Sequence, residues 1–254
     1  MIPLRDQDYI RDRFARELDG KVKIDYFTQR PSPLYVPGRE ECAYCGDVQQ
    51  ILEELAALSE KVTLTVHEFA DAPEEARKLG VDKVPGIVVR GPANRPLRFF
   101  GMPGGNEFPN FVEAIVAASK QQADVTPEIA KQLKKLKDNV AVVVYVTPTC
   151  PYCPGVVRAA YRLALASTHI HASAVEISEF PRLAQQLNLR GVPMTVIDDR
   201  VVITGATDEA GLLDGVHKAL EGGPLGAPAS RAGAMTDASA QPGPSPAGGL
   251  ILPG

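Results

Sequence analysis

Residues of the same kind recur at one fixed offset along this chain. Four positions in the first half each have a counterpart at the same distance further along, as the following pairs show: Cys42 and Cys150, Cys45 and Cys153, Glu68 and Glu176, and Pro85 and Pro193. A valine precedes each of the two prolines. Chance does not account for a single offset at all four positions, so we expect the chain to fold as two copies of one structural unit.

The hydrophobic pattern predicts the same order of elements in both copies. In the second copy, the β-branched run over residues 140–146 is typical of a strand buried on both faces, and from Val156 the apolar residues recur at helical spacing. The first copy has a strand candidate over residues 22–27 and a helical pattern from Val48. A C-x-x-C motif follows the first strand of each copy. This order predicts an α/β fold, a tandem repeat of two thioredoxin-like units with a mixed sheet flanked by helices.

Local signals mark the limits of the two units. We expect the first unit over residues 1–119 and the second over residues 120–222, because Thr126-Pro127-Glu128 opens a fresh helix with an N-cap residue, a proline and an acid. Residues 223–254 consist mainly of Gly, Pro, Ala and Ser. Such a segment buries too little apolar surface to offset its ordering entropy, so a disordered tail is predicted there.

Composition restricts the classes of function that the chain can have. The net charge of −4 and the absence of a Lys/Arg cluster disfavour nucleic-acid binding, and no apolar run reaches membrane-spanning length. The charges within residues 1–14 are not those expected of a signal peptide, so none is predicted there. Four cysteines in 254 residues are too few for a secreted disulfide scaffold. We therefore expect a cytoplasmic protein without nucleic-acid or membrane partners.

The two cysteine pairs are the predicted catalytic dithiol/disulfide centres. Each pair opens a helix, where unpaired backbone N–H groups and the helix dipole stabilise a thiolate, the reactive form of cysteine. Cys42 and Cys150 are predicted to attack, and Cys45 and Cys153 to resolve the mixed disulfide. Inert buried thiols are the simpler alternative, which the strand–helix position disfavours. A zinc site is disfavoured because the two pairs lie far apart in separate copies, so no metal site is predicted.

Val84 with Pro85, and Val192 with Pro193, are the predicted substrate-binding residues. Each proline follows the second cysteine of its copy at the same distance in the sequence. A cis proline there would turn the backbone of the preceding valine toward a substrate chain for strand-like pairing, whereas an ordinary proline at a strand start is the alternative.

Two acids in register, Glu68 and Glu176, are further candidates for the redox chemistry. A buried carboxylate beside the cysteines would take a proton from the resolving thiol. The preferred interpretation is nevertheless that both residues are solvated ends of strands.

A family resemblance rests on the Cys-Pro-Tyr-Cys stretch Thr147–Pro154, on the segment Arg98–Pro103 with Glu107-Phe108, and on both Val-Pro pairs. Over about residues 6–222 the chain resembles the protein disulfide oxidoreductases, glutaredoxin-like proteins with two fused thioredoxin-fold units. The resemblance implies an enzyme of cell redox homeostasis that reduces, forms or isomerises protein disulfides, with the C-terminal site dominant. It also implies no bound cofactor, and redox-active disulfides recharged by an NAD(P)H-dependent flavoprotein of the thioredoxin reductase type.

Two segments depart from that family pattern. Only Thr147, Pro148 and Thr149 stand between the strand end Val146 and Cys150, whereas the much longer Pro-rich loop Thr28–Glu41 stands before Cys42. This loop therefore contains an insertion, which we expect to gate or redirect the first cysteine pair. The tail after residue 222 is likewise extra.

Two other functions stay open. One is a dedicated electron shuttle from a flavoprotein reductase to a peroxiredoxin, since similar tandem units form the N-terminal domain of alkyl hydroperoxide reductase flavoproteins. Only one C-x-x-C motif survives in that domain, so the two motifs here count against it. The other is a substrate-binding holdase, which the retention of both cysteines in both pairs disfavours.

Overall fold

The computed structural model describes residues 2–31, 41–120 and 123–222. The first unit contains α1 (Leu4–Glu17), β1 (Val22–Thr28), α2 (Cys45–Ala57), β2 (Val62–Glu68), α3 (Pro73–Leu79), β3 (Gly86–Arg90), β4 (Leu97–Phe100) and α4 (Glu107–Ser119). The second unit contains α5 (Pro127–Leu133), β5 (Val140–Val146), α6 (Cys153–Ala166), β6 (Ile170–Glu176), a 3-10 turn (Ile177–Glu179), α7 (Pro181–Gln186), β7 (Met194–Ile197), β8 (Val201–Thr204) and α8 (Glu209–Leu220).

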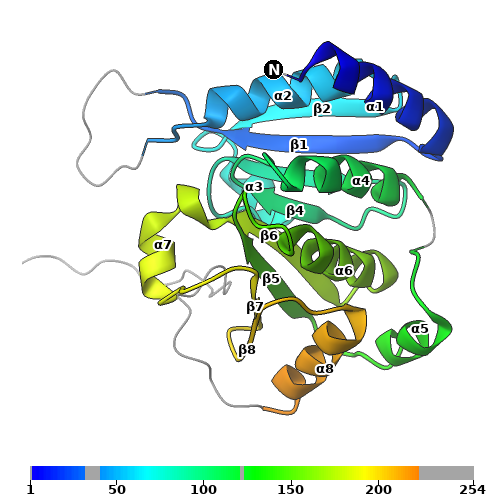
Figure 1. Cartoon of the computed structure of the whole chain (residues 1–254), viewed down its shortest axis with the longest axis vertical. Coiled ribbons are helices and arrows are strands. Elements are labelled where there is room, and N and C mark those ends of the chain that lie inside the picture. The colour runs from blue at the N-terminus through cyan, green and yellow to red at the C-terminus, as the bar shows by residue number, and fades with distance from the viewer. Residues whose placement is uncertain (1, 32–40, 121–122, 223–254) are drawn as a thin grey trace, which may run out of the picture.

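The same order of elements in both units confirms the predicted repeat (Figure 1). Local chemistry sets several element ends as expected. The Thr126 side chain accepts a hydrogen bond from the Ile129 N–H and caps α5, and Gly80 ends α3 with a φ of 69°. The predicted tail, residues 223–254, and most of the insertion before Cys42 lie outside the described residues.

The eight strands within the described ranges form one continuous sheet in the order β2-β1-β3-β4-β6-β5-β7-β8. The units join through β4 and β6, which pair in parallel from Arg98 opposite Ser173 to Phe100 opposite Val175. β1 is antiparallel to β3, and β3 to β4, so β1 runs in the direction of β4, β6 and β5. The carboxyl ends of β1 and β5 therefore lie at the same edge of the sheet, four strand spacings or about 19 Å apart.

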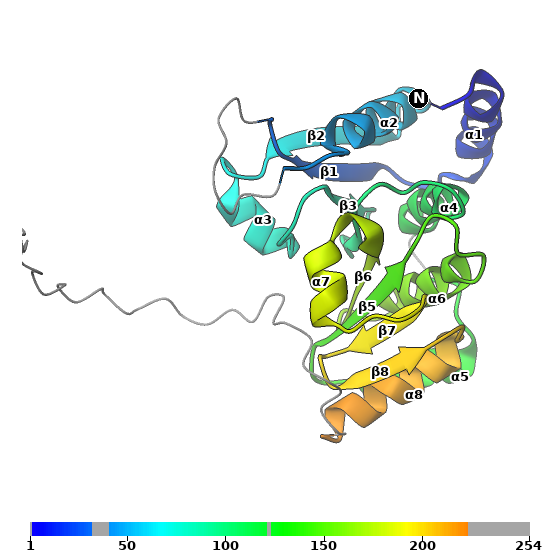
Figure 2. The ribbon, with the colours of Figure 1, turned by 60° about the vertical axis from the view of Figure 1, so that its left-hand side comes forward.

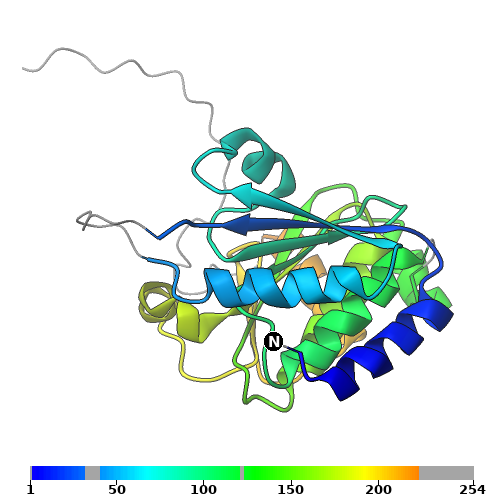
Figure 3. The same cartoon turned by 90° about the horizontal axis from the view of Figure 1, so that it is seen from above.

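Helices cover both faces of this sheet (Figure 2, Figure 3). One face packs against α2, α4, α6 and α8, with α1 and α5 at their side, and α3 and α7 lie on the other. The larger hydrophobic cluster spans both units and includes Phe14, Ile24, Val144 and Leu163, all without solvent exposure. Each such fully buried side chain stabilises the fold by about 1.5–3 kcal/mol. The two units thus share one sheet and one core.

Polar contacts also join the units where α6 packs on β4 and α4. The buried Tyr161 hydroxyl donates to the Arg98 carbonyl at 2.6 Å, and Arg158 pairs with Glu113 at 2.5 Å. Each contact connects the second unit to the first. The interface is therefore specified by hydrogen bonds as well as by apolar packing.

A buried carboxylate lies in the middle of β1. Asp25 has no solvent exposure and accepts hydrogen bonds from Arg90 at 2.5 Å and from His67 at 3.1 Å, with Lys23 at 3.2 Å. Burial alone would raise the pKa of Asp25, but the hydrogen bonds from Arg90, His67 and Lys23, together with the Arg90 charge, outweigh it and lower this pKa below its usual value. Asp25 is therefore held as an anion by partners on β2 and β3.

Candidate active site

Each C-x-x-C pair forms a disulfide at the junction predicted for it. Cys42 bonds to Cys45 and Cys150 to Cys153, with 5.5 Å between the Cα atoms in both pairs. The second cysteine is the first residue of its helix, α2 or α6. We call the Cys42–Cys45 pair the first site and the Cys150–Cys153 pair the second site. In both sites the N-terminal cysteine is the more exposed one.

The second site sits on a short, tight turn. The Cys150 N–H donates to the Thr147 carbonyl at 3.2 Å, and the Cys153 N–H donates to the Cys150 Sγ at 3.1 Å. A backbone donor at the start of α6 thus points at the sulfur of the N-terminal cysteine. Such a donor also stabilises the thiolate that forms on reduction, because a hydrogen bond to the charged form favours it.

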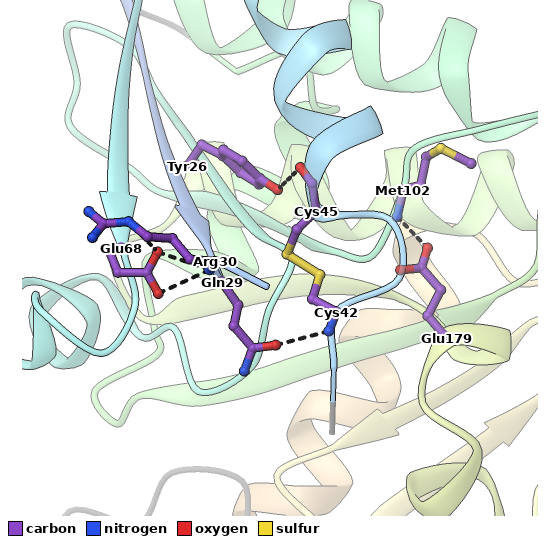
Figure 4. The surroundings of a disulfide bond; sticks show 8 residues. All are labelled: Tyr26, Gln29, Arg30, Cys42, Cys45, Glu68, Met102 and Glu179. Carbon is purple, nitrogen blue, oxygen red and sulfur yellow. Dashed lines mark hydrogen bonds and ion pairs between the residues drawn. A yellow bond between two sulfur atoms is a disulfide. The ribbon is translucent and has the colours of Figure 1, made fainter. Parts of the chain in front are cut away.

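The first site has different neighbours (Figure 4). The Cys42 N–H donates to the Gln29 Oε1 at 2.9 Å, and the Tyr26 hydroxyl donates to the Cys45 carbonyl at 2.7 Å. Burial raises the pKa of Tyr26 to about 12, and the charge of Glu179 acts in the same direction. Tyr26 therefore stays a neutral hydrogen-bond donor beneath the start of α2.

The two predicted prolines lie beside the ends of the strands that lead to the cysteines. The Val84-Pro85 and Val192-Pro193 bonds are both cis, which confirms that prediction. Antiparallel pairing sets Gly86 opposite Phe27 and Met194 opposite Tyr145, so each proline stands at the carboxyl end of β1 or β5. The proline carbonyls accept equivalent hydrogen bonds, from the Gly101 N–H at 2.9 Å and the Gly205 N–H at 2.8 Å. The two units thus share not only the order of their elements but also this individual hydrogen bond.

Glu68 and Glu176 are not the solvated strand ends that the sequence favoured. Glu176 is buried, and its Oε1 accepts from the Ser178 N–H at 3.1 Å. The Glu68 side chain is only 12% exposed and accepts from the Arg30 N–H at 3.1 Å (Figure 4). Glu176 binds an N–H just after its own strand β6, whereas Glu68, at the end of β2, binds an N–H just after the neighbouring strand β1. In both places the chain has left the sheet, so the backbone donor needs a partner other than a strand.

Sequence reasoning missed two acids, the partly buried Glu179 and the buried Glu107, that lie where the two units meet. Glu179, on the turn after β6, is among the residues around the first disulfide, and its Oε1 accepts from the Met102 N–H at 2.6 Å (Figure 4). Burial and the neighbouring Glu176 charge raise the pKa of Glu179 to about 7. No periodicity marks this residue, because its role depends on packing between the units.

Glu107, the first residue of α4, is the second acid. It is 1% exposed, its Oε2 accepts from the Asn110 Nδ2 at 2.9 Å, and its Oε1 has no hydrogen-bond partner within the described ranges. Burial raises the pKa of Glu107 above its usual value, although Asn110 and Arg158 oppose the shift. Glu107 is part of the Glu107-Phe108 pair on which the family resemblance partly rests. That pair was the one signal in the sequence that pointed to this residue.

The loop between β4 and α4 reaches the second site. The Asn106 N–H donates to the carbonyl of Pro148, just ahead of Cys150, at 2.9 Å. Gly105 has a φ of 55°, and a Cβ placed there would lie 2.3 Å from that same carbonyl oxygen. Glycine at position 105 is therefore needed both for its backbone conformation and for the close approach of the units.

Substitution of Gly105 by alanine should destabilise the protein by about 1–3 kcal/mol, because it adds a left-handed backbone penalty to a steric clash. Chemical denaturation would measure the loss of unfolding free energy. Gly104→Ala is the matched control, since a Cβ at position 104 would lie at ordinary contact distance, 3.7 Å, from the Met102 side chain. Equal stability of the two variants would contradict this account of the loop.

A pocket of about 600 Å³ extends from the second proline across β7 and β8. Its lining is mostly apolar and includes Leu187, Val192, Pro193, Met194 and Val202. Arg190 and Asp199 supply charge at this pocket. The pocket is thus suited to an apolar segment of a polypeptide that approaches the Val192-Pro193 loop.

No group of three or more His, Cys, Asp or Glu side chains in the described ranges is arranged to hold a metal ion. No helix within them is both long and apolar enough to cross a bilayer.

Comparisons with known proteins agree with this architecture. A family model described as a thioredoxin domain matches residues 35–113 and 139–215, one stretch in each unit. The N-terminal domain of alkyl hydroperoxide reductase AhpF from Enterococcus faecalis superposes with a TM-score of 0.75 at 25% identity, over 85% of this chain and 100% of that one. A protein disulfide oxidoreductase from Aeropyrum pernix gives a TM-score of 0.77 at 24% identity, over 91% and 97% of the two chains, and shares the fold.

Among curated proteins, the F subunit of alkyl hydroperoxide reductase from Escherichia coli is 24% identical over 161 residues, which is 63% of this chain and 29% of that protein. Its counterpart from Xanthomonas campestris is 25% identical over 193 residues, which is 74% of this chain and 34% of that protein. The chain thus spans about a third of the length of these two relatives. The similarity therefore covers one part of a longer protein in each case.

Proposed function

Because this chain belongs to the thioredoxin domain family, we propose that it is a thiol–disulfide oxidoreductase that reduces, forms or isomerises disulfides in proteins. The observation that carries this proposal is a site that occurs twice. In each copy a disulfide lies where a strand is followed by a helix, and a Val-Pro pair from the antiparallel neighbouring strand lies beside the end of that first strand. A fold that served only for docking would need neither cysteine of each pair. We further propose a cytoplasmic location, where a dithiol can be kept reduced.

The proposed reaction is two successive thiol–disulfide exchanges. The thiolate of Cys42 or Cys150 attacks one sulfur of a substrate disulfide, whose S–S bond breaks, and a substrate thiolate leaves. The thiolate of Cys45 or Cys153 then attacks the mixed disulfide, closes the intramolecular disulfide and releases the second substrate thiol. Two electrons pass from the dithiol to the substrate, and the reverse sequence oxidises a substrate dithiol.

Val84 and Val192 are proposed to hold the substrate chain. Each valine is partly exposed and precedes a buried proline. The Val-Pro pair leads into β3 or β7, which pairs with the strand that ends before the cysteines. Backbone pairing at that position would align an extended substrate with the N-terminal cysteine. The apolar pocket next to Val192 supports a polypeptide substrate at the second site.

An insulin reduction assay with dithiothreitol tests the proposed function. We expect the wild-type chain to accelerate insulin precipitation, each pair-to-serine variant to keep part of the rate, and the variant without any cysteine to have none. The proposal fails if the cysteine-free variant matches the wild-type rate.

Recharging is proposed to come from a flavoprotein that uses NAD(P)H, with no cofactor bound by the chain itself. One observation favours a second candidate function, an electron shuttle to a peroxiredoxin: the curated relatives described above are F subunits of alkyl hydroperoxide reductases. NADH oxidation in the presence of a flavoprotein reductase, a peroxiredoxin and peroxide would measure that activity. A peroxide-dependent rate far above the insulin-dependent rate would favour the shuttle.

The two sites should have different reduction potentials because their surroundings differ. The Cys150 sulfur accepts a backbone hydrogen bond at the start of α6, whereas Cys42 is more exposed and has Gln29 as a neighbour. One hydrogen bond contributes about 1 kcal/mol, which corresponds to roughly 20–30 mV for a two-electron couple. Redox titration of single-site variants would measure the difference, and two coincident titration curves would contradict it.

A further inference from the structure

The last strand of the sheet, β8, has an outer edge with which no other strand of the described residues pairs (Figure 2). The Gly205 N–H donates to the Pro193 carbonyl, and hydrogen-bonded pairs alternate with non-hydrogen-bonded pairs along two antiparallel strands. Val202 and Thr204 therefore fall in non-hydrogen-bonded pairs with β7. Their backbone N–H and C=O groups point away from β7, toward the outer edge.

The first unit shows what covers the corresponding edge there. β4 is the counterpart of β8, since each pairs with the strand that follows a cis proline, and each precedes a glycine whose N–H donates to that proline's carbonyl. The outer edge of β4, from Arg98 to Phe100, pairs in parallel with β6. Within the described residues, a strand of this kind thus receives a parallel neighbour in the first unit and none in the second.

Apolar side chains that follow this pairing bury the face of the sheet beside β4. Val175 of β6 and Ile177, just after β6, lie in one hydrophobic cluster with Val88 and Phe100. In the second unit the counterpart of this surface is the apolar pocket along β7 and β8. The second unit therefore has the surface, but the described residues include no strand that buries it.

Exposure of equivalent side chains shows the same difference. Val202 lies opposite Val196 on β7, as Arg98 lies opposite Val88 on β3. The Val202 residue is 42% exposed, whereas Arg98 is 8% exposed. An exposed valine beside an apolar pocket indicates a surface that becomes buried in a complex.

The residue in front of each Val-Pro pair also differs, since it is Lys83 in the first unit and Gly191 in the second. The Lys83 ammonium lies 4.2 Å from the centre of the Phe100 ring. Gly191 lines the pocket and has no side chain that could extend over it. The second unit thus keeps accessible a surface that the first unit fills from both sides.

We propose that β8 and its pocket bind an extended polypeptide strand, which adds to the sheet in parallel with β8 as β6 adds to β4. Main-chain hydrogen bonds to Val202 and Thr204 hold the strand, and its alternate side chains enter the pocket. The spacing of Val175 and Ile177 defines the ligand class, two aliphatic residues separated by one other residue. This inference goes beyond the proposed function, because the strand binds whether or not the cysteines react.

The charges at the pocket define the ligand further. Arg190 precedes β7 and Asp199 follows it, so these two lining residues mark opposite ends of the pocket. A strand parallel to β8 begins near Asp199 and ends near Arg190, because β8 starts just after the hairpin. Charge complementarity therefore favours a ligand with a basic residue before its two aliphatic residues and an acidic residue after them.

The added strand ends at the edge of the sheet that carries the second site. β5 and β8 are both antiparallel to β7, so their carboxyl ends lie at that same edge. The added strand lies three strand spacings from β5, about 14 Å, which about four or five extended residues span. For a redox substrate, a cysteine that follows the strand at this spacing reaches Cys150, and this one consequence rests on the proposed function.

A peptide copied from the chain itself is the probe. It has the sequence of residues 170–179, Ile-His-Ala-Ser-Ala-Val-Glu-Ile-Ser-Glu, and carries a fluorophore at its N-terminus. Its binding to the full oxidised chain is measured by fluorescence anisotropy. Gly191→Lys and Val202→Asp should each weaken binding at least tenfold, because the first extends a side chain over the pocket and the second buries a charge in it. A Cβ at Gly191 would meet no atom within 4 Å, so the lysine variant keeps the fold.

Val66→Asp is the matched control for Val202→Asp. Val66 lies on β2, the strand at the opposite edge of the sheet, and is 41% exposed. Its replacement should leave peptide binding within twofold of the wild-type value. Arg190→Glu should weaken binding, and a peptide with lysine in place of both glutamates should bind this variant better than it binds the wild type.

Hydrogen exchange followed by NMR separates strand addition from binding in the pocket alone. The backbone N–H groups of Val202 and Thr204 should exchange at least tenfold more slowly when the peptide is bound, because they then donate to it. The N–H of Val66 should exchange at an unchanged rate.

The inference is wrong if the peptide does not bind, if Val202→Asp and Val66→Asp bind it equally, or if it binds without protecting these two N–H groups. It is also wrong if both groups are already protected in the peptide-free protein, because another part of the chain or a second copy then covers the edge. These measurements do not involve cysteine reactivity, so the insulin assay decides the proposed function separately.

Discussion

Replacement of Cys150 by serine is expected to remove most of the dithiothreitol-coupled insulin reduction, with a loss of at least tenfold. The reason is that the second site combines a short turn with a backbone donor to the Cys150 sulfur, which stabilises the attacking thiolate. It also has the apolar pocket beside Val192 and Pro193. The initial rate of insulin precipitation measures the effect.

Two further variants make this expectation specific. Cys153→Ser removes the resolving thiol and should trap a mixed disulfide between Cys150 and the substrate, visible as a covalent adduct on a non-reducing gel. Cys42→Ser is the matched control, since it removes the corresponding nucleophile of the first site. If Cys42→Ser proved more damaging than Cys150→Ser, the assignment of the second site as dominant would be wrong.

Replacement of Arg90 by methionine should destabilise the protein by about 2–3 kcal/mol. Removing one partner of a buried ion pair leaves an uncompensated charge, which usually costs about 3–5 kcal/mol. We expect the lower value because His67 and Lys23 remain next to Asp25. Urea unfolding at pH 7 measures the change in the free energy of unfolding.

A second substitution and a pH series identify the cause. The double variant Asp25→Asn/Arg90→Met should recover at least half of the loss, because it removes the unpaired charge. In the wild type the pKa of Asp25 is lowered on folding, so its stabilisation is present above the unfolded value and is lost as pH falls through the folded one. The difference between wild type and Arg90→Met should therefore shrink below about pH 4. A difference that does not depend on pH would point to packing instead.

The contacts between the units change how the repeat is understood. Gly105 and Asn106 of the first unit lie against Pro148 beside the second site, and Glu179 of the second unit lies beside the first. Each site is thus completed by residues of the other unit. Variants at these positions are expected to affect a site to which they are distant in sequence.

The sequence by itself determined the repeated unit and the core chemistry. Alternating and helical apolar patterns report which side of an element is buried, so strand 140–146 and the helix after Cys153 are found where expected. Because the two copies are related by a constant offset, a role predicted for a residue in one unit could also be predicted for its counterpart in the other. The cis state of both Val-Pro bonds could be predicted as well, because proline is the residue that tolerates it and its spacing from the cysteines was matched.

Only the tertiary structure decided how the units combine. No local pattern states that β4 pairs with β6, because strand pairing depends on complementarity between edges that lie far apart in the sequence. The burial of Glu176 and the partial burial of Glu68 were missed for the same reason: a polar residue at a strand end looks solvated until its backbone partners are known. Glu107 and Glu179 became candidates only when packing between the units removed them from water, since desolvation is a property of the surroundings and not of the residue.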